Sequence, residues 1–195
     1  MSGTDVHAAR ARIHRIAAGL FALHGYHATG MAKISEAVGL GRGALYHHIR
    51  SKESVLFAIS NDTIDQLLEP SRLIVARDES AESRMRALAR VLVVNVAEFS
   101  SEWTVFFREH VALSDRLHQQ VVAKRDEYEG LWLQLLVEGA RTGEFRQVDP
   151  ILTKGILGMF NYAHLWLKSD GPTAPEEVAD QFCEVLLGGL LARKR

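Results

Sequence analysis

The chain has 195 residues, of which 47% are hydrophobic and 24% charged, so it can form one or two small domains with an ample core and is not a disordered protein. Its one cysteine, Cys183, excludes an internal disulfide framework and offers no metal cluster. No apolar run approaches the ~18 residues of a membrane span, and the N-terminal segment lacks the apolar core of a signal peptide. We therefore expect a soluble cytoplasmic protein with no membrane partner.

Charge is distributed unevenly along the chain. Residues 1–55 hold seven Lys/Arg and three Asp/Glu, a net charge of +4; because the whole chain carries −1, residues 56–195 carry −5. Six of the nine histidines also lie in the first segment. Proteins that bind nucleic acid concentrate positive charge on one face, so this asymmetry predicts a nucleic-acid-binding N-terminal part.

Helical patterns dominate from the start, and no stretch alternates like a β-strand. A first helix is predicted over about Asp5 to His24, with Gly25 as its stop. Its inward face carries apolar residues at helical spacing: Ile13, Ile16, Ala17, Leu20 and Phe21. We expect an all-α fold.

The segment Thr29–Lys52 reads as two short helices joined by a tight glycine turn, which is the build of a helix-turn-helix. Thr29 is the expected N-cap of the first helix, and Gly39 suits the left-handed position that ends it. The second helix should run from Gly41 or Arg42 to about Arg50, with Leu45 and Ile49 on its inner face. Its opposite face then carries Gly43, Ala44, Tyr46 and His47, a surface suited to close approach to DNA.

A long helix should follow Ser51, which can cap it, with Lys52 and Glu53 in its first turn. Lys52 is unfavourable at a helix N-terminus unless a phosphate binds there; a solvated lysine is the alternative reading. Pro70 is expected to end or kink this helix. It could matter for signalling, or it could mark a simple helix end.

Five further helical segments complete the chain. They are predicted over Ala81–Ser100, Glu102–His110, Asp115–Thr142, Asp149–Lys168 and about Ala174 to Ala192. Asp149-Pro150 reads as a cap followed by a first-turn proline, and Arg193-Lys194-Arg195 at the end suits the helix dipole.

The last two helices are apolar around most of their surface, so each must be buried by a core on one side and a partner subunit on the other. Gly155 and Gly158 in one helix, and Gly188 and Gly189 in the other, would permit close helix approach. We predict a homodimer formed through these two helices. Such a dimer suits paired recognition helices set roughly 34–36 Å apart on a pseudo-palindromic site.

These residues resemble the TetR family of one-component bacterial repressors. The resemblance is strongest over residues 10–57 and is carried by Gly25-Tyr26, Thr29, Ile34, Ala37-x-Gly39-Leu40, Gly43-x-Leu45-Tyr46-His47-His48 and Ser51-Lys52-Glu53. It implies a DNA-binding domain over residues 1–55, an effector-binding and dimerisation domain over 56–195, and repression relieved by a small molecule. The expected DNA-binding residues are Thr29, Lys33, Arg42, Gly43, Ala44, Tyr46, His47 and Lys52.

The segment Glu102–Leu191 resembles family members that respond to acyl-CoA thioesters, through pieces such as Gly143-x-Phe145-Arg146 and Asp149-Pro150. Leu165-Trp166-Leu167 lacks an arginine that many of those relatives carry, so a flat hydrophobic effector such as a drug stays an alternative. Ligand pockets are mostly apolar with a few polar groups. The candidate ligand residues are Trp103, Phe106, Phe107, Arg108, Tyr128, Trp132, Phe160, Asn161, His164 and Trp166.

Three other functions fit the sequence less well. An enzyme would have to use Ser114, His110 or Cys183, whose spacing matches no catalytic template. A metal sensor would have to use the N-terminal histidines, but His47 and His48 point about 100° apart on a helix. A ligand-binding module without DNA activity would need a silent recognition face. We expect no cofactor, no metal and no catalysis.

Overall fold

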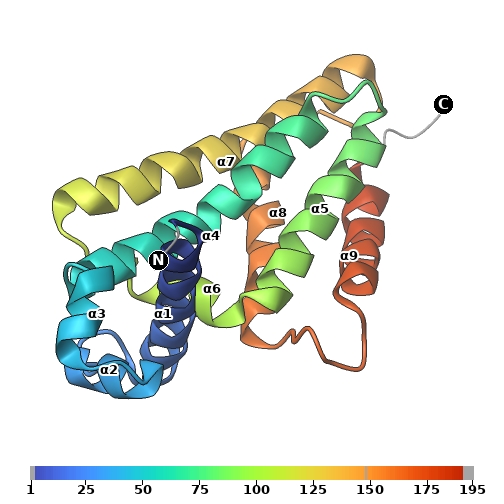
Figure 1. The fold of residues 1–195 in the computed structure, drawn as a ribbon. Coiled ribbons are helices and arrows are strands. Elements are labelled where there is room, and N and C mark those ends of the chain that lie inside the picture. Colours follow the sequence, from blue (N-terminus) through green and yellow to red (C-terminus); the bar gives the residue numbers. More distant parts are fainter. Residues whose placement is uncertain (1–2, 148, 191–195) are drawn as a thin grey trace. The chain divides into compact units, whose positions relative to one another are not determined.

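The structure, a computed structural model, describes residues 3–147 and 149–190, and its regular elements in these ranges are all helical (Figure 1). This confirms the predicted all-α class. The elements in chain order are α1 (Gly3–His24), α2 (Met31–Val38), α3 (Arg42–His48), α4 (Lys52–Val75), α5 (Ala81–Glu98), α6 (Ser100–Arg108), η1 (His110–Ala112), α7 (Asp115–Thr142), α8 (Ile151–Asn161), η2 (Tyr162–Leu165) and α9 (Pro175–Leu190).

Contacts divide the chain into two compact units. Unit 1 contains residues 1–63 and 101–122, and unit 2 contains residues 64–100 and 123–195. Residues 101–122, which form most of α6, η1 and the first turns of α7, therefore pack with the N-terminal helices. The functional boundary near residue 55 stays a prediction.

In unit 1, α1 packs against both α2 and α3, and α2 packs against α3. The core between them is built from large apolar side chains with 0–1% exposure, including Ile13, Phe21, Ile34 and Leu45. Gly39 ends α2 with φ +74°, and its backbone N–H donates to the Glu36 carbonyl. A side chain is strained at this φ, so glycine is what allows the tight turn between the two helices.

α4 begins as expected and ends differently. Ser51 caps it as predicted, because its hydroxyl accepts the Ser54 N–H at 3.0 Å. Pro70 was predicted to end or kink this helix. The helix end is wrong, since α4 continues to Val75, and the kink stays a prediction. Ser71, Ile74 and Val75 after the proline are buried, with exposures of 0%, 3% and 6%. Burial of this last turn offsets the hydrogen bond that proline cannot make.

In unit 2, α5 packs against α8 and α9, and α8 also contacts α9. The interior of this bundle includes Leu88 and Leu92 of α5 and Cys183 and Leu187 of α9, all 0–1% exposed. At its edge the Arg86 guanidinium donates to Glu184 at 2.7 Å, and the Arg90 guanidinium donates to Asp180 at 2.7 Å.

The later helix boundaries match the predictions well, with one correction. α7 spans the predicted residues, and Gly143 follows it with φ +79°. The single helix predicted over Asp149–Lys168 is instead α8, which ends at Asn161, followed by the separate turn η2. The N-cap of α8 is Pro150 rather than the predicted Asp149, and the Asp149 carboxylate accepts the Ile151 N–H at 2.8 Å. The predictions for Leu191 and for Arg193-Lys194-Arg195 lie outside the described residues.

Candidate nucleic-acid interface

The short helix α3 has one buried face and one open face. Leu45 is fully buried, and Ile49, just after the helix, is 5% exposed. The residues of the opposite face are exposed: Arg42, Gly43, Ala44, Tyr46 and His47. The predicted division of this helix into an inner and an outer face is confirmed. Packing of Leu45 fixes the rotation of α3, and this rotation turns the polar residues outward.

The open face of α3 is cationic and aromatic. The Arg42 guanidinium lies 6.0 Å from the centroid of the Tyr46 ring, one helical turn away. Ring centroids of His47 and His48 are 5.8 Å apart in an edge-to-face arrangement. α3 contains no acidic residue. Lys33 of α2 is also exposed. A face with donors and no carboxylate suits contact with phosphates and base edges.

Two arginines of α1 hold the helix-turn-helix in shape, a role that the sequence reasoning missed. Arg10 donates to the His48 carbonyl at 3.0 Å, and Arg12 donates to the Val38 carbonyl at 3.1 Å. These carbonyls belong to the last residues of α3 and α2, where cations complement the helix dipole. Two of the positive charges counted in residues 1–55 therefore have partners within the chain. Cations spaced along α1 were the signal, but the carbonyls that they reach lie far away in sequence.

Lys52 has partners within the protein as well. Its ammonium donates to the Tyr26 carbonyl at 3.0 Å and lies 4.2 Å from the centroid of the Tyr26 ring. These contacts answer the question of how a lysine is tolerated at the start of α4. An ammonium has three donors, so a further bond to a phosphate stays geometrically open, and the phosphate contact stays a prediction.

Thr29 requires a correction. The residue that caps α2 is Gly30, not Thr29. Thr29 is fully buried, its hydroxyl donates to the Gly25 carbonyl at 2.9 Å, and its N–H donates to the Tyr26 carbonyl at 3.1 Å. The hydroxyl thus ties the end of α1 to the start of α2. A side chain in this position cannot present its hydroxyl to DNA, so we do not propose Thr29 as a DNA contact.

The ten predicted ligand residues fall into two separate sets. Trp103, Phe106, Phe107 and Arg108 belong to unit 1, and the other six belong to unit 2. In unit 1, Trp103 and Phe106 are buried, with 1% and 5% exposure and ring centroids 5.5 Å apart. Trp103 also stacks on Phe107 at 5.5 Å. Arg108 is exposed.

In unit 2 the aromatic candidates form a connected row. Tyr128 and Trp132 lie one turn apart on α7 with centroids 6.3 Å apart, and Trp132 and Phe160 follow at 5.7 Å. Phe182, which the sequence reasoning did not select, lies between Phe160 at 5.9 Å and Trp166 at 6.3 Å. Its signal was its position on an apolar stripe of α9, which indicates packing as readily as binding.

The remaining two candidates are Asn161 and His164. The His164 ring nitrogen Nδ1 lies 2.7 Å from the Asn161 carbonyl oxygen. The Asn161 side-chain oxygen is buried and has no hydrogen-bond partner. Trp166 beside them is 48% exposed, so its ring is only partly covered by the described residues.

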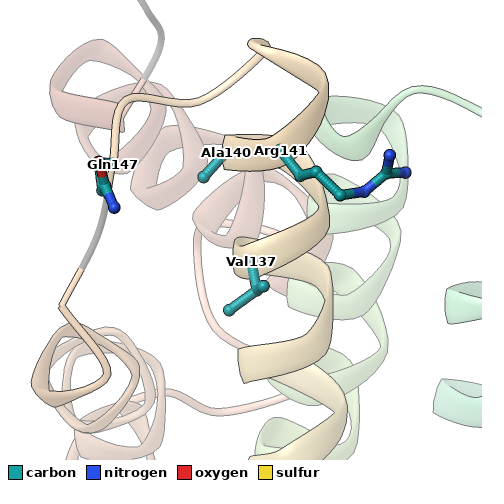
Figure 2. Close-up of a pocket in the computed structure, with 4 residues that line it drawn as sticks. All are labelled: Val137, Ala140, Arg141 and Gln147. Carbon is teal, nitrogen blue, oxygen red and sulfur yellow. The ribbon is translucent and has the colours of Figure 1, made fainter.

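A hollow of about 320 Å³ lies at the C-terminal end of α7 and is lined by Val137, Ala140, Arg141 and Gln147 (Figure 2). None of the ten predicted ligand residues lines it. Figure 2 shows the Arg141 guanidinium extending away from Gln147, so the charged group is not turned toward the amide across the hollow. A second hollow, of about 340 Å³, runs along α5 and is lined by Arg90, Val91, Val94, Asn95 and Glu98.

Residues 3–147 and 149–190 lack features of two other functional classes. No three His, Cys, Asp or Glu side chains in these ranges come together in a way that could hold a metal ion. None of the helices described there combines the length and the apolar character needed to cross a bilayer.

Comparison with known proteins places the two ends of the chain in one family. Residues 13–59 match the family described as bacterial regulatory proteins of the tetR family. Residues 78–190 match the family described as the tetracyclin repressor-like C-terminal domain.

Three relatives illustrate the similarity. The HTH-type transcriptional repressor KstR2 of Mycolicibacterium smegmatis is 27% identical over 184 residues, which cover 93% of this chain and 90% of KstR2. The TetR family regulator PfmR from Thermus thermophilus has a TM-score of 0.84 at 29% identity, covering 94% of this chain and all of PfmR. AibR, solved in complex with isovaleryl coenzyme A and operator DNA, has a TM-score of 0.79 at 28% identity, covering 95% of this chain and all of AibR. With its helix-turn-helix, its all-helical fold and both family matches, the chain is a member of the TetR family of bacterial regulatory proteins.

Proposed function

We propose that the protein is a homodimeric repressor that binds a pseudo-palindromic operator in the bacterial cytoplasm and is released from it by a small hydrophobic effector. The observation that carries the DNA-binding part is the open face of α3, where Arg42, Tyr46 and His47 are exposed beside two small residues. Residues 1–55 would provide DNA binding, and residues 56–195 would provide effector binding and dimerisation.

The residues of this face suit different contacts. The Arg42 guanidinium can form two parallel hydrogen bonds to a guanine edge or a phosphate. Tyr46 and His47 carry donors that reach base edges or phosphate oxygens, and Gly43 and Ala44 let the helix approach the DNA backbone closely. Lys33 and Lys52 would contact phosphates.

The test is a mobility shift with DNA from upstream of the protein's own gene. We expect R42A, Y46A and H47A each to lower operator affinity by roughly 5- to 100-fold, since one good base or phosphate contact contributes about 1–3 kcal/mol. Because all three side chains are exposed, circular dichroism should stay helical. R125A is the matched control, because Arg125 is an exposed cation of α7 that pairs with the neighbouring Asp126. Unchanged affinity in Y46A and H47A would refute the assignment.

The homodimer is supported by the exposed apolar residues of α8, η2 and α9. Ile151 is 67% exposed, Tyr162 63%, Leu165 49% and Val185 74%. Ile151 and Tyr162 share one side of the α8 segment with two exposed glycines, by helical spacing. In a single protomer this apolar surface would stay in contact with water. A second copy related by two-fold symmetry would cover it.

The glycines of these helices support the same interface. Gly155, Gly158, Gly188 and Gly189 lie in exposed positions, and a Cβ atom added at any of them would meet open space within the protomer. Glycine inside a helix is about 1 kcal/mol less favourable than alanine. Packing within one chain therefore does not require glycine here. Close approach by a helix of a partner subunit does require glycine, so we infer that α8 and α9 pack against the same two helices of the partner subunit.

The effector is proposed to be small and hydrophobic, with an acyl-CoA or another intermediate of lipid breakdown as the first choice. This choice follows the C-terminal sequence resemblance and the ligand of AibR, which is isovaleryl coenzyme A. A flat aromatic compound is the alternative. A thermal-shift panel of acyl-CoAs, fatty acids and aromatic drugs separates the two, because a ligand that binds the folded state raises its melting temperature. The same compound must then release the protein from operator DNA, since it has to favour one conformational state.

A further inference from the structure

The two short helices of the helix-turn-helix have little of their own to fix their position. α2 has eight residues and α3 has seven, fewer than the ~12 that an isolated helix needs in water. Both lie within the described residues, and in both the N-cap is a glycine, Gly30 or Gly41, without a side-chain cap. The buried side chain of α3 is Leu45. The placement of α3 therefore depends on contacts from neighbouring elements.

Arg10 and Arg12 of α1 provide such contacts. The Arg10 Nε–H donates to the His48 carbonyl at 3.0 Å, and the Arg12 Nη2 group donates to the Val38 carbonyl at 3.1 Å. At about 100° per residue, the buried Ile13 lies between the two arginines around α1. The guanidinium groups thus flank the buried stripe of α1. Each reaches the C-terminal end of one short helix, where a positive charge is favourable.

The two helix ends depend on these arginines to different degrees. At the end of α2, the N–H groups of Gly39 and Leu40 also donate to carbonyls of the last turn. At the end of α3, Ile49 provides one such N–H, and Arg10 provides the bond to the carbonyl of the last helical residue. Loss of Arg10 should therefore loosen α3 more than loss of Arg12 loosens α2.

Attraction of a phosphate is the other role open to these arginines, because both are exposed. A cation that only neutralises phosphate strengthens binding to every DNA sequence alike. A residue that fixes the place of α3 acts on base contacts instead, because these depend on geometry. Affinity for the correct sequence then falls with the fraction of molecules whose helix is correctly placed. The Arg10 Nε–H bond to a protein carbonyl favours this second role.

We propose that Arg10 and Arg12 are positioning residues that determine operator discrimination without touching a base, Arg10 more strongly than Arg12. Discrimination means here the ratio of the affinity for operator to the affinity for scrambled DNA. The inference rests on the proposed function, since it specifies how the open face of α3 is aimed at the operator. The bonds to the ends of α3 and α2 would set where that face lies.

The first test measures amide hydrogen exchange by NMR on the full chain without DNA. In R10A, we expect the amides of Leu45 and Ile49 to exchange roughly 3- to 10-fold faster, which is the effect of losing one hydrogen bond. R12A should speed exchange in α2 by a smaller factor. The amides of Leu88 and Leu92 in α5 should not change in either variant, which would exclude a general loss of stability.

The second test compares operator and scrambled DNA in mobility shifts. R15A is the matched control, because Arg15 lies on the same helix and its charge acts on Glu102 of α6. R10A and R15A remove the same charge, so they should weaken binding to scrambled DNA equally. R10A alone should lose a further 3- to 10-fold, roughly, on the operator. R10K restores a cation with a donor and should regain most of the discrimination.

Unchanged exchange of Leu45 and Ile49 in R10A would overturn the inference. An equal loss on operator and scrambled DNA would also overturn it and make Arg10 a phosphate contact. Loss of discrimination in R15A to the same degree would assign the effect to charge alone. In each of these cases a wild-type protein that binds its operator keeps the proposed function. A wild-type protein that does not distinguish operator from scrambled DNA would instead refute both, even with faster exchange in R10A.

Discussion

At the scale of single residues, the two glycines of α7 show how packing gives one residue type opposite roles. Gly130 is exposed, and a Cβ added there would meet nothing within 4 Å. At Gly139, by contrast, an added Cβ would lie 2.3 Å from the Phe145 ring. Phe145 is 2% exposed and lies just after the turn that follows α7. Glycine is thus required at position 139, because the segment that follows α7 returns past it and brings Phe145 into contact.

We predict that G139A lowers the free energy of unfolding by about 1–3 kcal/mol, because the new methyl group forces the ring and backbone apart. G130A should instead raise it by up to about 1 kcal/mol, through helix propensity alone. Urea denaturation of the two variants and the wild type measures both. Equal effects of the two substitutions would contradict the packing argument.

A second residue-scale feature is the carboxylate of Glu53, which accepts the Ser114 backbone N–H at 2.8 Å. This hydrogen bond from Ser114 holds the pKa of Glu53 below its ordinary value of 4.5. A carboxyl group with a lowered folded-state pKa stabilises the fold above the unfolded-state pKa, and this stabilisation is lost as pH falls through the folded-state value.

E53Q should therefore melt at a lower temperature than the wild type at pH 7, and the difference should shrink as the pH is lowered from about 4.5. Melting curves from neutral pH down to about pH 3 provide the measurement. E36Q, which removes an exposed carboxylate from α2 of the same unit, is the charge-matched control and should leave the pH dependence unchanged. A wild-type–E53Q difference that persists at acid pH would speak against the Ser114 bond.

At the scale of elements, α4 contains a proline in its interior and still runs unbroken for 24 residues. Proline disfavours a helix interior by about 3 kcal/mol relative to alanine, because one backbone hydrogen bond is lost and the ring crowds the preceding turn. The buried residues after Pro70 and the pairing of Arg72 with Glu127 hold the last turns in place. Local propensity is overruled here by packing.

P70A should raise the free energy of unfolding, by at most about 3 kcal/mol, in chemical denaturation. If Pro70 also serves the response to effector, the variant should retain operator affinity and need more effector for release in a mobility shift. A less stable P70A would mean that the ring itself fills a required space.

At the scale of the whole molecule, the proposed dimer determines whether two recognition helices can bind together. G158L and G188L place a large side chain on the proposed interface, and the Cβ atom at either position meets nothing within 4 Å in the protomer. We predict monomers with a mass near 21.7 kDa by light scattering, unchanged helicity and much weaker operator binding. G130L, on the exposed face of α7, should remain dimeric. Dimeric G158L and G188L would exclude α8 and α9 as the interface.

Much of the fold could be predicted from local patterns. Apolar residues at helical spacing predicted the helices, Gly39 predicted the turn after α2, and Leu45 predicted which face of α3 is buried. Each of these features depends on residues within one or two helical turns. The cap at Thr29 and the helix end at Pro70 were predicted wrongly, because tertiary packing decides both. Gly30 took the capping position while Thr29 packed inward, and burial of Ser71, Ile74 and Val75 kept α4 intact past its proline.

The sequence by itself determined the family, the all-helical class and the exposed face of α3, since each is encoded by spacing within short segments. Only the tertiary structure decided that Arg10 and Arg12 serve helix ends 38 and 26 residues away. It likewise decided that the predicted ligand residues divide between two units. These facts depend on which helices pack together, and a helical pattern specifies a buried face without specifying its neighbour.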